Sequence, residues 1–188
     1  MEILAPRSQH EEYKRFIERI IDALADELDL SAEPRGSTTW KRKRDAKGAE
    51  PDTCYYIRSA ERIVGKGNID INEDPPPDLV VEIDATSESV HKFPIYAAFR
   101  IPEIWRYQVK RNLVEMYELR GAQYIEIASS LTFEMLTPSV LSDFIAQSKT
   151  RGQKSRPRRV PLLMRPIRGQ LGKTNRIIAD LSDFVDEG

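Results

Sequence analysis

The run LVVEID at residues 79–84 is the feature that most restricts how this chain can fold. Its branched aliphatic residues are consecutive rather than alternating, as in a strand that is covered on both faces. Such strands occur where helices pack on the two sides of a parallel or mixed sheet. The run nevertheless contains Glu82 and ends at Asp84, and an unpaired carboxylate in a core costs several kcal/mol or becomes protonated. A central strand whose acids have partners or a function is therefore predicted.

The segments around this run predict an α/β domain with a mixed sheet flanked by helices. Residues 9–28 carry apolar side chains at helical spacing, and Ser8 is placed to cap that helix. The remaining pattern alternates between strand-like and helical segments. We expect strands at 37–42 and 53–59, a loop at 45–51, a helical segment at 87–99, three antiparallel strands in meander order between 101 and 129, and a closing helix at 136–148.

Charge divides the chain into two parts. Residues 1–144 hold 19 Lys and Arg against 26 Asp and Glu, whereas residues 145–188 hold 10 against 4. We therefore expect one domain at residues 1–148 and a basic, mobile tail at 149–188. Whether that tail contacts nucleic acid or its own acidic domain stays open, and the KRKR run at 41–44 is likewise either a solvated edge or a phosphate contact.

Composition narrows the class of protein further. Hydrophobic residues make up 40% of the chain and charged residues 31%, which is typical of a globular protein. No apolar run approaches the ~18 residues of a membrane span. The single cysteine, Cys54, excludes an internal disulfide and a cysteine-based zinc site. A cytoplasmic protein without membrane contact is expected.

The acids of PPPDLVVEID are not equivalent. Asp78 follows three prolines at the strand entrance, where a structural acid that caps a turn is the default interpretation. Residues i and i+2 of a strand share a face, so Glu82 and Asp84 point the same way, ~6.6 Å apart. Glu82 is either a buried acid satisfied by an arginine or by backbone donors, or a metal ligand. On residue chemistry alone the two interpretations are even.

A second aromatic strand begins directly after Asp52, and neighbouring strands in a sheet lie only ~4.8 Å apart. If the two strands pair, Asp52 and Glu82 converge on one hard cation, which prefers oxygen ligands. Asp84 would join them directly or through water, and Lys92 would bring its ammonium to the same place. Two or three acids with one lysine form a site for metal-assisted phosphodiester hydrolysis.

The ordered set EPD, a strand, DLVVEIDATS, K…Y and PEIWRY resembles the Uma-two family over residues 1–144, including the segment EILAPRSQHEEY. That bacterial family is restriction-endonuclease-like and belongs to the PD-(D/E)xK nuclease superfamily. The resemblance implies Mg²⁺, with Mn²⁺ as an alternative, held by Asp52, Glu82 and the carbonyl of Ile83. It also implies that Lys92, supplied from the helix after the strand, orients the attacking water or stabilises the charge that develops on the phosphorane. Asp84 stands where E-x-K has its lysine, and is then a partner of Lys92 or a further ligand.

The function that the resemblance implies is hydrolysis of DNA by an endonuclease, with RNA as an alternative substrate and a homodimer left open. The rival hypothesis is a catalytically inactive nucleic-acid-binding or assembly protein on the same fold. Two observations support this rival hypothesis. Asp84 stands in place of the usual lysine, and fewer residues precede EILAP than the family usually has. His10 is either structural or a contact to phosphate or metal, and only the resemblance supports the second interpretation. Tyr96, Trp105 and Tyr107 are expected to pack in the core.

Overall fold

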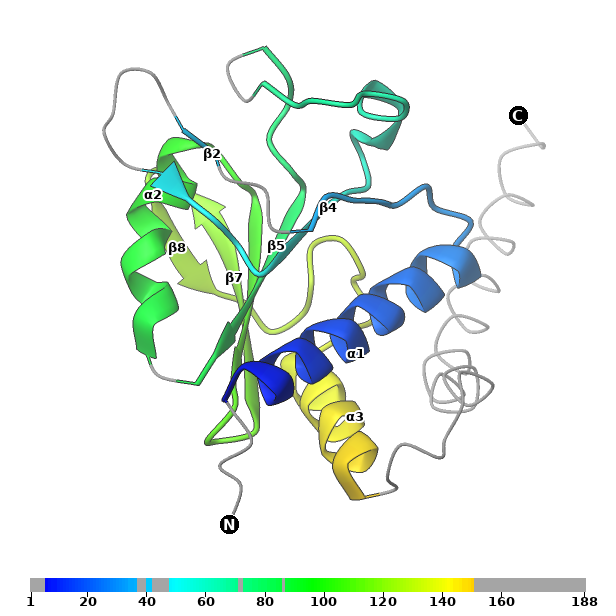
Figure 1. Ribbon diagram of the computed structural model, residues 1–188, viewed down its shortest axis with the longest axis vertical. Helices are drawn as coiled ribbons and strands as arrows, with labels where there is room; N and C mark the ends of the chain where they lie inside the picture. The colour runs from blue at the N-terminus through cyan, green and yellow to red at the C-terminus, as the bar shows by residue number, and fades with distance from the viewer. Residues whose placement is uncertain (1–5, 37–39, 42–47, 71–72, 86, 151–188) are drawn as a thin grey trace, which may run out of the picture.

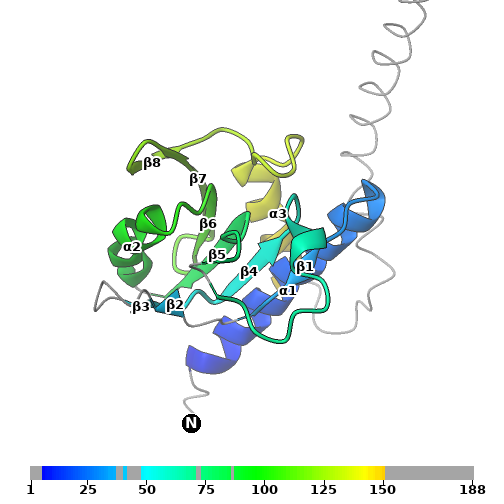
Figure 2. The same ribbon diagram turned by 90° about the horizontal axis from the view of Figure 1, so that it is seen from above.

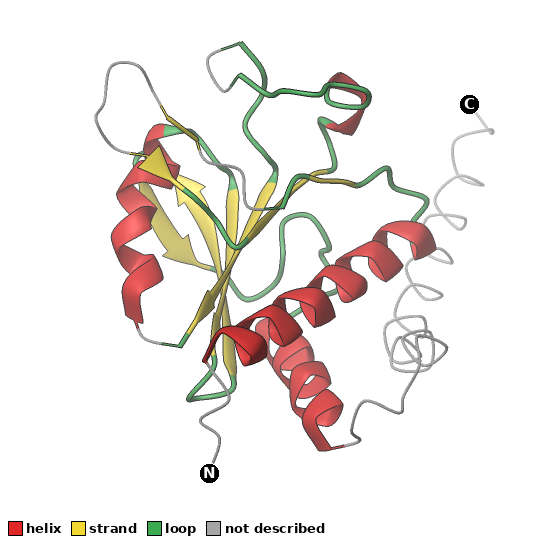
Figure 3. Ribbon diagram, viewed as in Figure 1, coloured by secondary structure: helices red, strands yellow, loops and turns green. Residues whose placement is uncertain are grey.

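A six-stranded mixed sheet, in the order β1-β4-β5-β6-β7-β8, organises the computed structural model (Figures 1 and 3). The structure describes residues 6–36, 40–41, 48–70, 73–85 and 87–150. The strands of this sheet are β1 (Glu33–Pro34), β4 (Thr53–Tyr56), β5 (Leu79–Asp84), β6 (Glu103–Gln108), β7 (Leu113–Arg120) and β8 (Gln123–Glu126). The other elements are α1 (Pro6–Glu27), β2 (Trp40–Lys41), β3 (Gly48–Ala49), the 3₁₀ helices η1 (Ala60–Arg62) and η2 (Ser87–Lys92), α2 (Phe93–Ala98) and α3 (Pro138–Thr150).

Strand β5 lies inside the sheet, between an antiparallel and a parallel neighbour. Its partner β4 is antiparallel and places Thr53 opposite Val81, whereas β6 is parallel and places Arg106 opposite Glu82. Parallel strands need a crossover connection, and η2 and α2 provide it. Strands β6, β7 and β8 then form an antiparallel meander. The predicted mixed sheet flanked by helices is confirmed.

Helices cover both faces of the sheet, with α1 and α3 on one side and α2 on the other (Figure 2). Side chains of β5 alternate between the two layers. Leu79, Val81 and Ile83 pack with α1 and α3, whereas Val80 packs with residues of α2. All six residues of β5 are buried, as predicted for a strand that is covered on both faces. Glu82 and Asp84 share the α2 side with Val80, so both acids face the crossover segment.

Two local predictions are wrong. Helix α1 begins at Pro6, so Ser8 lies within its first turn and not before it; a proline suits that turn because its φ is fixed and it has no N–H to satisfy. The loop predicted at 45–51 contains β3, in which Ala49 pairs with Trp40 of β2. Residues 42–44 of the KRKR run and the tail after residue 150 lie outside the described residues, so the predicted domain boundary stays a prediction. No helix in the described part of the chain has the length and apolar character to cross a bilayer.

Asp78 has the structural role expected at the entrance of β5. Its Oδ2 accepts hydrogen bonds from the backbone N–H of Ile57 at 2.8 Å, the backbone N–H of Ser59 at 3.2 Å and the Ser59 hydroxyl at 3.0 Å. One carboxylate oxygen therefore fixes the turn that follows β4. Pro77-Asp78 is thus a structural pair, and the assignment of Asp52 to the Asp of the PD-(D/E)xK pattern stays a prediction.

Asp78→Ala is expected to lower the free energy of unfolding by about 1–3 kcal/mol, because it leaves two backbone donors of that turn without their acceptor. Urea unfolding of the variant against wild type measures this change. Asp143→Ala is the matched control, since Asp143 is exposed on α3 and an exposed substitution changes stability by about 0.5 kcal/mol or less. Equal midpoints for the two variants would contradict the structural role of Asp78.

Candidate active site

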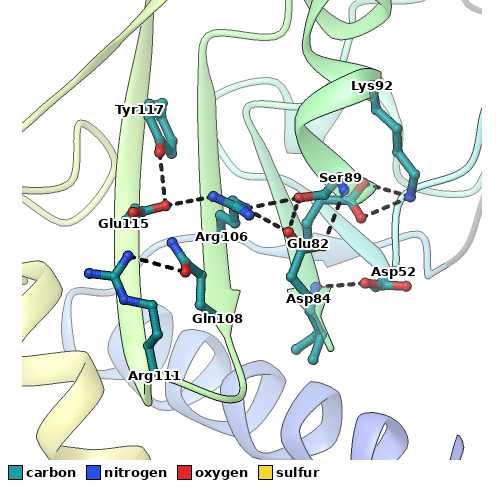
Figure 4. A network of polar contacts seen from close by, with 11 residues as sticks. Asp52, Glu82, Asp84, Ser89, Lys92, Arg106, Gln108, Arg111, Glu115 and Tyr117 are labelled. Atoms are coloured by element: carbon teal, nitrogen blue, oxygen red, sulfur yellow. Dashed lines mark hydrogen bonds and ion pairs between the residues drawn. The ribbon is translucent and has the colours of Figure 1, made fainter. Parts of the chain in front are cut away.

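Three separate segments bring Asp52, Glu82 and Lys92 together (Figure 4). Asp52 immediately precedes β4, Glu82 lies in β5, and Lys92 is the last residue of η2. Because β4 and β5 pair, Asp52 reaches the backbone of β5, where its Oδ2 accepts a hydrogen bond from the Ile83 N–H at 2.7 Å. This is the pairing on which the predicted convergence of Asp52 and Glu82 depends.

The Glu82 carboxylate is buried, with 2% of the side chain exposed, and it is fully engaged by the crossover segment. Lys92 Nζ donates to both of its oxygens, at 3.0 and 2.8 Å, and also to the carbonyl of Glu50 at 2.9 Å. The Tyr96 hydroxyl donates to Oε1. The buried acid thus has a lysine and a tyrosine as partners, rather than the arginine or backbone donors that were the structural alternative.

Burial raises the pKa of the Glu82 carboxyl to about 7, against the lowering effects of Lys92 and Tyr96. The negative charge of Asp52 raises the same pKa further. Burial and the neighbouring Glu82 also raise the pKa of Tyr96, so its phenol stays a proton donor in this contact. Glu82 consequently gains and loses its proton close to neutral pH.

His10 extends the site onto α1. Its Nε2 lies 3.1 Å from Oδ1 of Asp52, and 28% of the His10 side chain and 20% of the Asp52 side chain are exposed. Each oxygen of Asp52 therefore has its own partner, His10 of α1 for Oδ1 and the Ile83 N–H of β5 for Oδ2. Sequence reasoning left His10 between a structural role and a role in the site, and its contact to Asp52 places it beside the predicted ligands.

Asp84 belongs to a different group of contacts. Its Oδ2 accepts from Arg106 Nε at 2.6 Å and from the Ser89 hydroxyl at 2.7 Å, and its Oδ1 accepts from the Ser89 backbone N–H at 3.2 Å (Figure 4). The carboxylate that was predicted to bind metal or Lys92 is thus directed at Ser89 and Arg106. The structure brings Asp52, Glu82 and Lys92 together, and sets Asp84 two residues along the strand from Glu82.

The donors of this site suit a small oxygen-preferring cation. Asp52 and Glu82 supply carboxylate oxygens. The negative charges of the two acids repel each other, and a divalent cation bound between them would offset that repulsion. Among the described residues, no group of three or more His, Cys, Asp and Glu side chains is arranged to hold a metal ion. Mg²⁺ is commonly bound through one or two carboxylates, with water and substrate phosphate completing the shell. Asp52 and Glu82 are the residues that would hold it, with the Ile83 carbonyl as the predicted third donor.

Sequence reasoning missed Tyr96, Ser89 and Arg106 as parts of the site. The position of Tyr96 could have been predicted, because it lies four residues after Lys92 and residues at that spacing share a helix face. The predicted core position of Tyr96 is confirmed, since it is fully buried like Trp105 and Tyr107. Its hydroxyl also donates a hydrogen bond to Glu82. Ser89 and Arg106 have no comparable signal, because their contact depends on how the crossover segment lies against two strands.

A family model agrees with the sequence motifs. A family model, Uma2, described as "putative restriction endonuclease", matches residues 1–147. A solved structure described as a "putative nuclease belonging to DUF820" from Anabaena variabilis ATCC 29413 is 15% identical, with a TM-score of 0.49 over 77% of this chain and 86% of that chain. A search of curated proteins gives no match. The family match covers the six-stranded sheet, the site and most of α3, and the chain belongs to the Uma2 (Uma-two) family.

Proposed function

We propose that this protein is a metal-dependent endonuclease that hydrolyses phosphodiester bonds of DNA at a site formed by Asp52, Glu82 and Lys92. One observation supports the proposal above the others. Glu82 is almost fully buried, yet it carries a lysine on both oxygens and lies within the electrostatic reach of a second acid. A core acid with only a structural role needs a partner, but it does not need another acid beside it.

Each residue has a role that follows from its contacts. When bound, Mg²⁺ or Mn²⁺ polarises the scissile phosphate and lowers the pKa of a water molecule. Asp52 is held rigidly by His10 and by the Ile83 N–H, so it presents its charge in a fixed position. Lys92 has 32% of its side chain exposed and can turn its ammonium from Glu82 toward a phosphate or an attacking water. Tyr96 keeps the Glu82 carboxylate oriented.

Cleavage assays on purified protein test this proposal. Supercoiled DNA, linear DNA and single-stranded RNA are each incubated with Mg²⁺, Mn²⁺ or EDTA. We propose that the enzyme is cytoplasmic and that DNA is its substrate. Asp52→Ala and Glu82→Ala are expected to remove divalent-dependent cleavage, whereas the exposed control Asp143→Ala retains it. If wild type binds DNA without cutting it in any divalent ion, the catalytically inactive nucleic-acid-binding alternative replaces the nuclease. RNA cleavage alone would change the proposed substrate.

Cleavage is expected to rise with pH through about 7. The pKa of Glu82 lies at about 7, so below that pH the carboxyl is protonated and cannot bind a cation. Each pH unit below the pKa lowers the deprotonated fraction about tenfold. Calorimetric titration with Mg²⁺ should show the affinity rising in the same range and levelling above it. An affinity that is constant across neutral pH would remove Glu82 from the ligands.

The metal-free protein should lose stability over the same pH range. The folded-state pKa of Glu82 is raised from 4.5 to about 7, so between these values the folded state keeps a proton that the unfolded chain has released. Stability falls with pH wherever the folded state binds more protons, and the loss is on the order of a few kcal/mol for this shift. Urea unfolding at several pH values, with EDTA present, measures it. A Glu82→Gln variant should not show this loss.

A further inference from the structure

A buried ion network lies beside the candidate active site, on the same face of the sheet. Arg106 of β6, only 6% exposed, donates from Nε to Asp84 and from Nη1 to Glu115 Oε2 at 3.0 Å. Tyr117 donates its hydroxyl to the same Glu115 oxygen at 2.9 Å. The network therefore ties β5, β6 and β7 together (Figure 4). Ser89 belongs to it as well, because its hydroxyl accepts from Arg106 Nε at 3.1 Å.

Ser89 connects this network to Lys92. Both residues lie in η2, three positions apart, and a 3₁₀ helix has three residues per turn with i and i+3 eclipsed. Lys92 therefore lies directly one turn beyond Ser89. Ser89 is 2% exposed and both its backbone N–H and its hydroxyl donate to Asp84, so this turn of η2 is fixed to β5 from two atoms.

The spacing of β5 matches the spacing of η2. Glu82 and Asp84 are ~6.6 Å apart on one face of the strand, and one 3₁₀ turn rises ~6 Å. The contact between Asp84 and Ser89 therefore brings Lys92 to the level of Glu82, which is where Lys92 donates to both carboxylate oxygens. The two acids of the strand form two parallel contacts with one short helix.

This arrangement also accounts for the acid at position 84. A lysine there could accept no hydrogen bond from Ser89, and its charge would repel Arg106. An aspartate accepts from the Ser89 N–H, from the Ser89 hydroxyl and from Arg106 at once. Asp84 cannot replace the usual lysine because its carboxylate is a negatively charged hydrogen-bond acceptor. The same property lets it bind Ser89 and so hold η2 against β5.

We infer that Asp84 and Ser89 form a latch that positions Lys92, with Arg106 holding Asp84 in place. The inference rests on the proposed function, because Lys92 is the residue that this site would use at the phosphate. Asp84 is then neither a metal ligand nor a direct partner of Lys92. It is a positioning residue that acts on Lys92 through one turn of η2.

Chemical labelling of Lys92 in the metal-free protein tests the latch without requiring any nuclease activity. Trace acetylation with acetic anhydride, read by mass spectrometry, reports how strongly each lysine ammonium is held and covered. Ser89→Ala removes the hydroxyl contacts to Asp84 and Arg106 but leaves the Asp84–Arg106 ion pair. The expected result is a rise in Lys92 labelling on the order of tenfold, relative to Lys66 of the same sample.

Ser142→Ala is the matched control. Ser142 is also buried, and its hydroxyl donates to the Pro138 carbonyl and accepts from the Val114 N–H, far along the chain from η2. It should leave Lys92 labelling at the wild-type level. Unchanged labelling in Ser89→Ala, or an equal rise in both variants, would overturn the latch.

A second measurement separates positioning from metal binding. At a pH well above 7, where Glu82 is deprotonated, the affinity of Ser89→Ala and Asp84→Asn for Mg²⁺ by calorimetry should stay within about twofold of wild type, because neither variant alters Asp52 or Glu82. The single-turnover cleavage rate should fall on the order of tenfold in Ser89→Ala, with unchanged DNA affinity. A large loss of Mg²⁺ affinity in Asp84→Asn would make Asp84 a ligand and overturn the inference. If wild type does not cleave, the proposed function fails, while Lys92 labelling still decides the latch.

Discussion

Glu82→Gln is expected to lower divalent-dependent cleavage by at least about 10³-fold while leaving the protein folded. Metal-assisted stabilisation of the phosphate is worth several kcal/mol, and each 1.4 kcal/mol is a factor of ten in rate. The amide has nearly the shape of the carboxylate, and its one oxygen, placed at Oε1, still accepts from Tyr96 and Lys92. It loses the second Lys92 contact and carries no charge for a cation. Lys92 keeps access to solvent, since 32% of its side chain is exposed.

The stability of this variant distinguishes a functional acid from a structural one. At a pH above about 7, wild type holds a buried charge that burial disfavours, and Glu82→Gln removes it. The free energy of unfolding above that pH should therefore equal or exceed the wild-type value in EDTA. Urea unfolding, Mg²⁺ calorimetry and cleavage rate are measured on the same preparation. Retained Mg²⁺ affinity and rate would contradict the role of Glu82.

Glu103→Gln provides the matched control, because it makes the same change in another fully buried acid of the sheet. Glu103 accepts hydrogen bonds from Trp105 Nε1, from the backbone N–H groups of Leu131 and Thr132, and from the Thr132 hydroxyl. An amide has one oxygen, so it can accept only two of the four, and its NH₂ group meets the other two donors without accepting from them. This variant should therefore lose about 1–3 kcal/mol of stability. It should nevertheless bind Mg²⁺ and cleave normally below its unfolding range. Glu82→Gln is thus expected to lose activity and keep stability, whereas Glu103→Gln is expected to lose stability and keep activity.

The fold could be predicted where one element's pattern was sufficient by itself. LVVEID gave a strand covered on both faces because its apolar residues are consecutive, and the spacing within residues 9–28 gave α1. Turn residues after 109 and 119 gave the β6–β8 meander. The helix start and β3 could not be predicted as well. The helix start depends on local end contacts that apolar spacing does not contain, and β3 depends on pairing with a strand of only two residues.

The sequence could predict those parts of the candidate site that depend only on which strands are neighbours. Asp52 and Glu82 converge because β4 and β5 pair, which their position in the chain made a reasonable expectation. The face of Asp84 was predictable but its partners were not, because its carboxylate is held by one residue of η2 and one residue of β6. Only the register of β6 against β5 brings Arg106 within 2.6 Å of it. Side-chain pairing between elements is set by tertiary packing, which single-sequence patterns do not contain.

Lys92→Met is expected to lower the cleavage rate on the order of 10²–10³-fold and to move its pH dependence upward. The first effect follows from loss of the ammonium that would face the phosphate or the attacking water. The second follows from Glu82, because Lys92 lowers the pKa of that carboxyl and its removal raises the value further above 7. Methionine fills much of the same space as the lysine stem, so the buried acid becomes protonated near neutrality rather than unfolding the protein.

The pH dependence is what separates Lys92→Met from Glu82→Gln. In Lys92→Met, Mg²⁺ affinity is reduced at neutral pH but recovers as the pH rises, because the ligand itself is still present and only its proton is held more tightly. Glu82→Gln recovers at no pH. Lys66→Met is the control, since Lys66 pairs with Asp74 outside the site and its loss should change neither property. A Lys92→Met enzyme with the wild-type rate and pH midpoint would mean that the lysine of η2 does not serve the reaction, and the migrated-lysine hypothesis for this chain would be wrong.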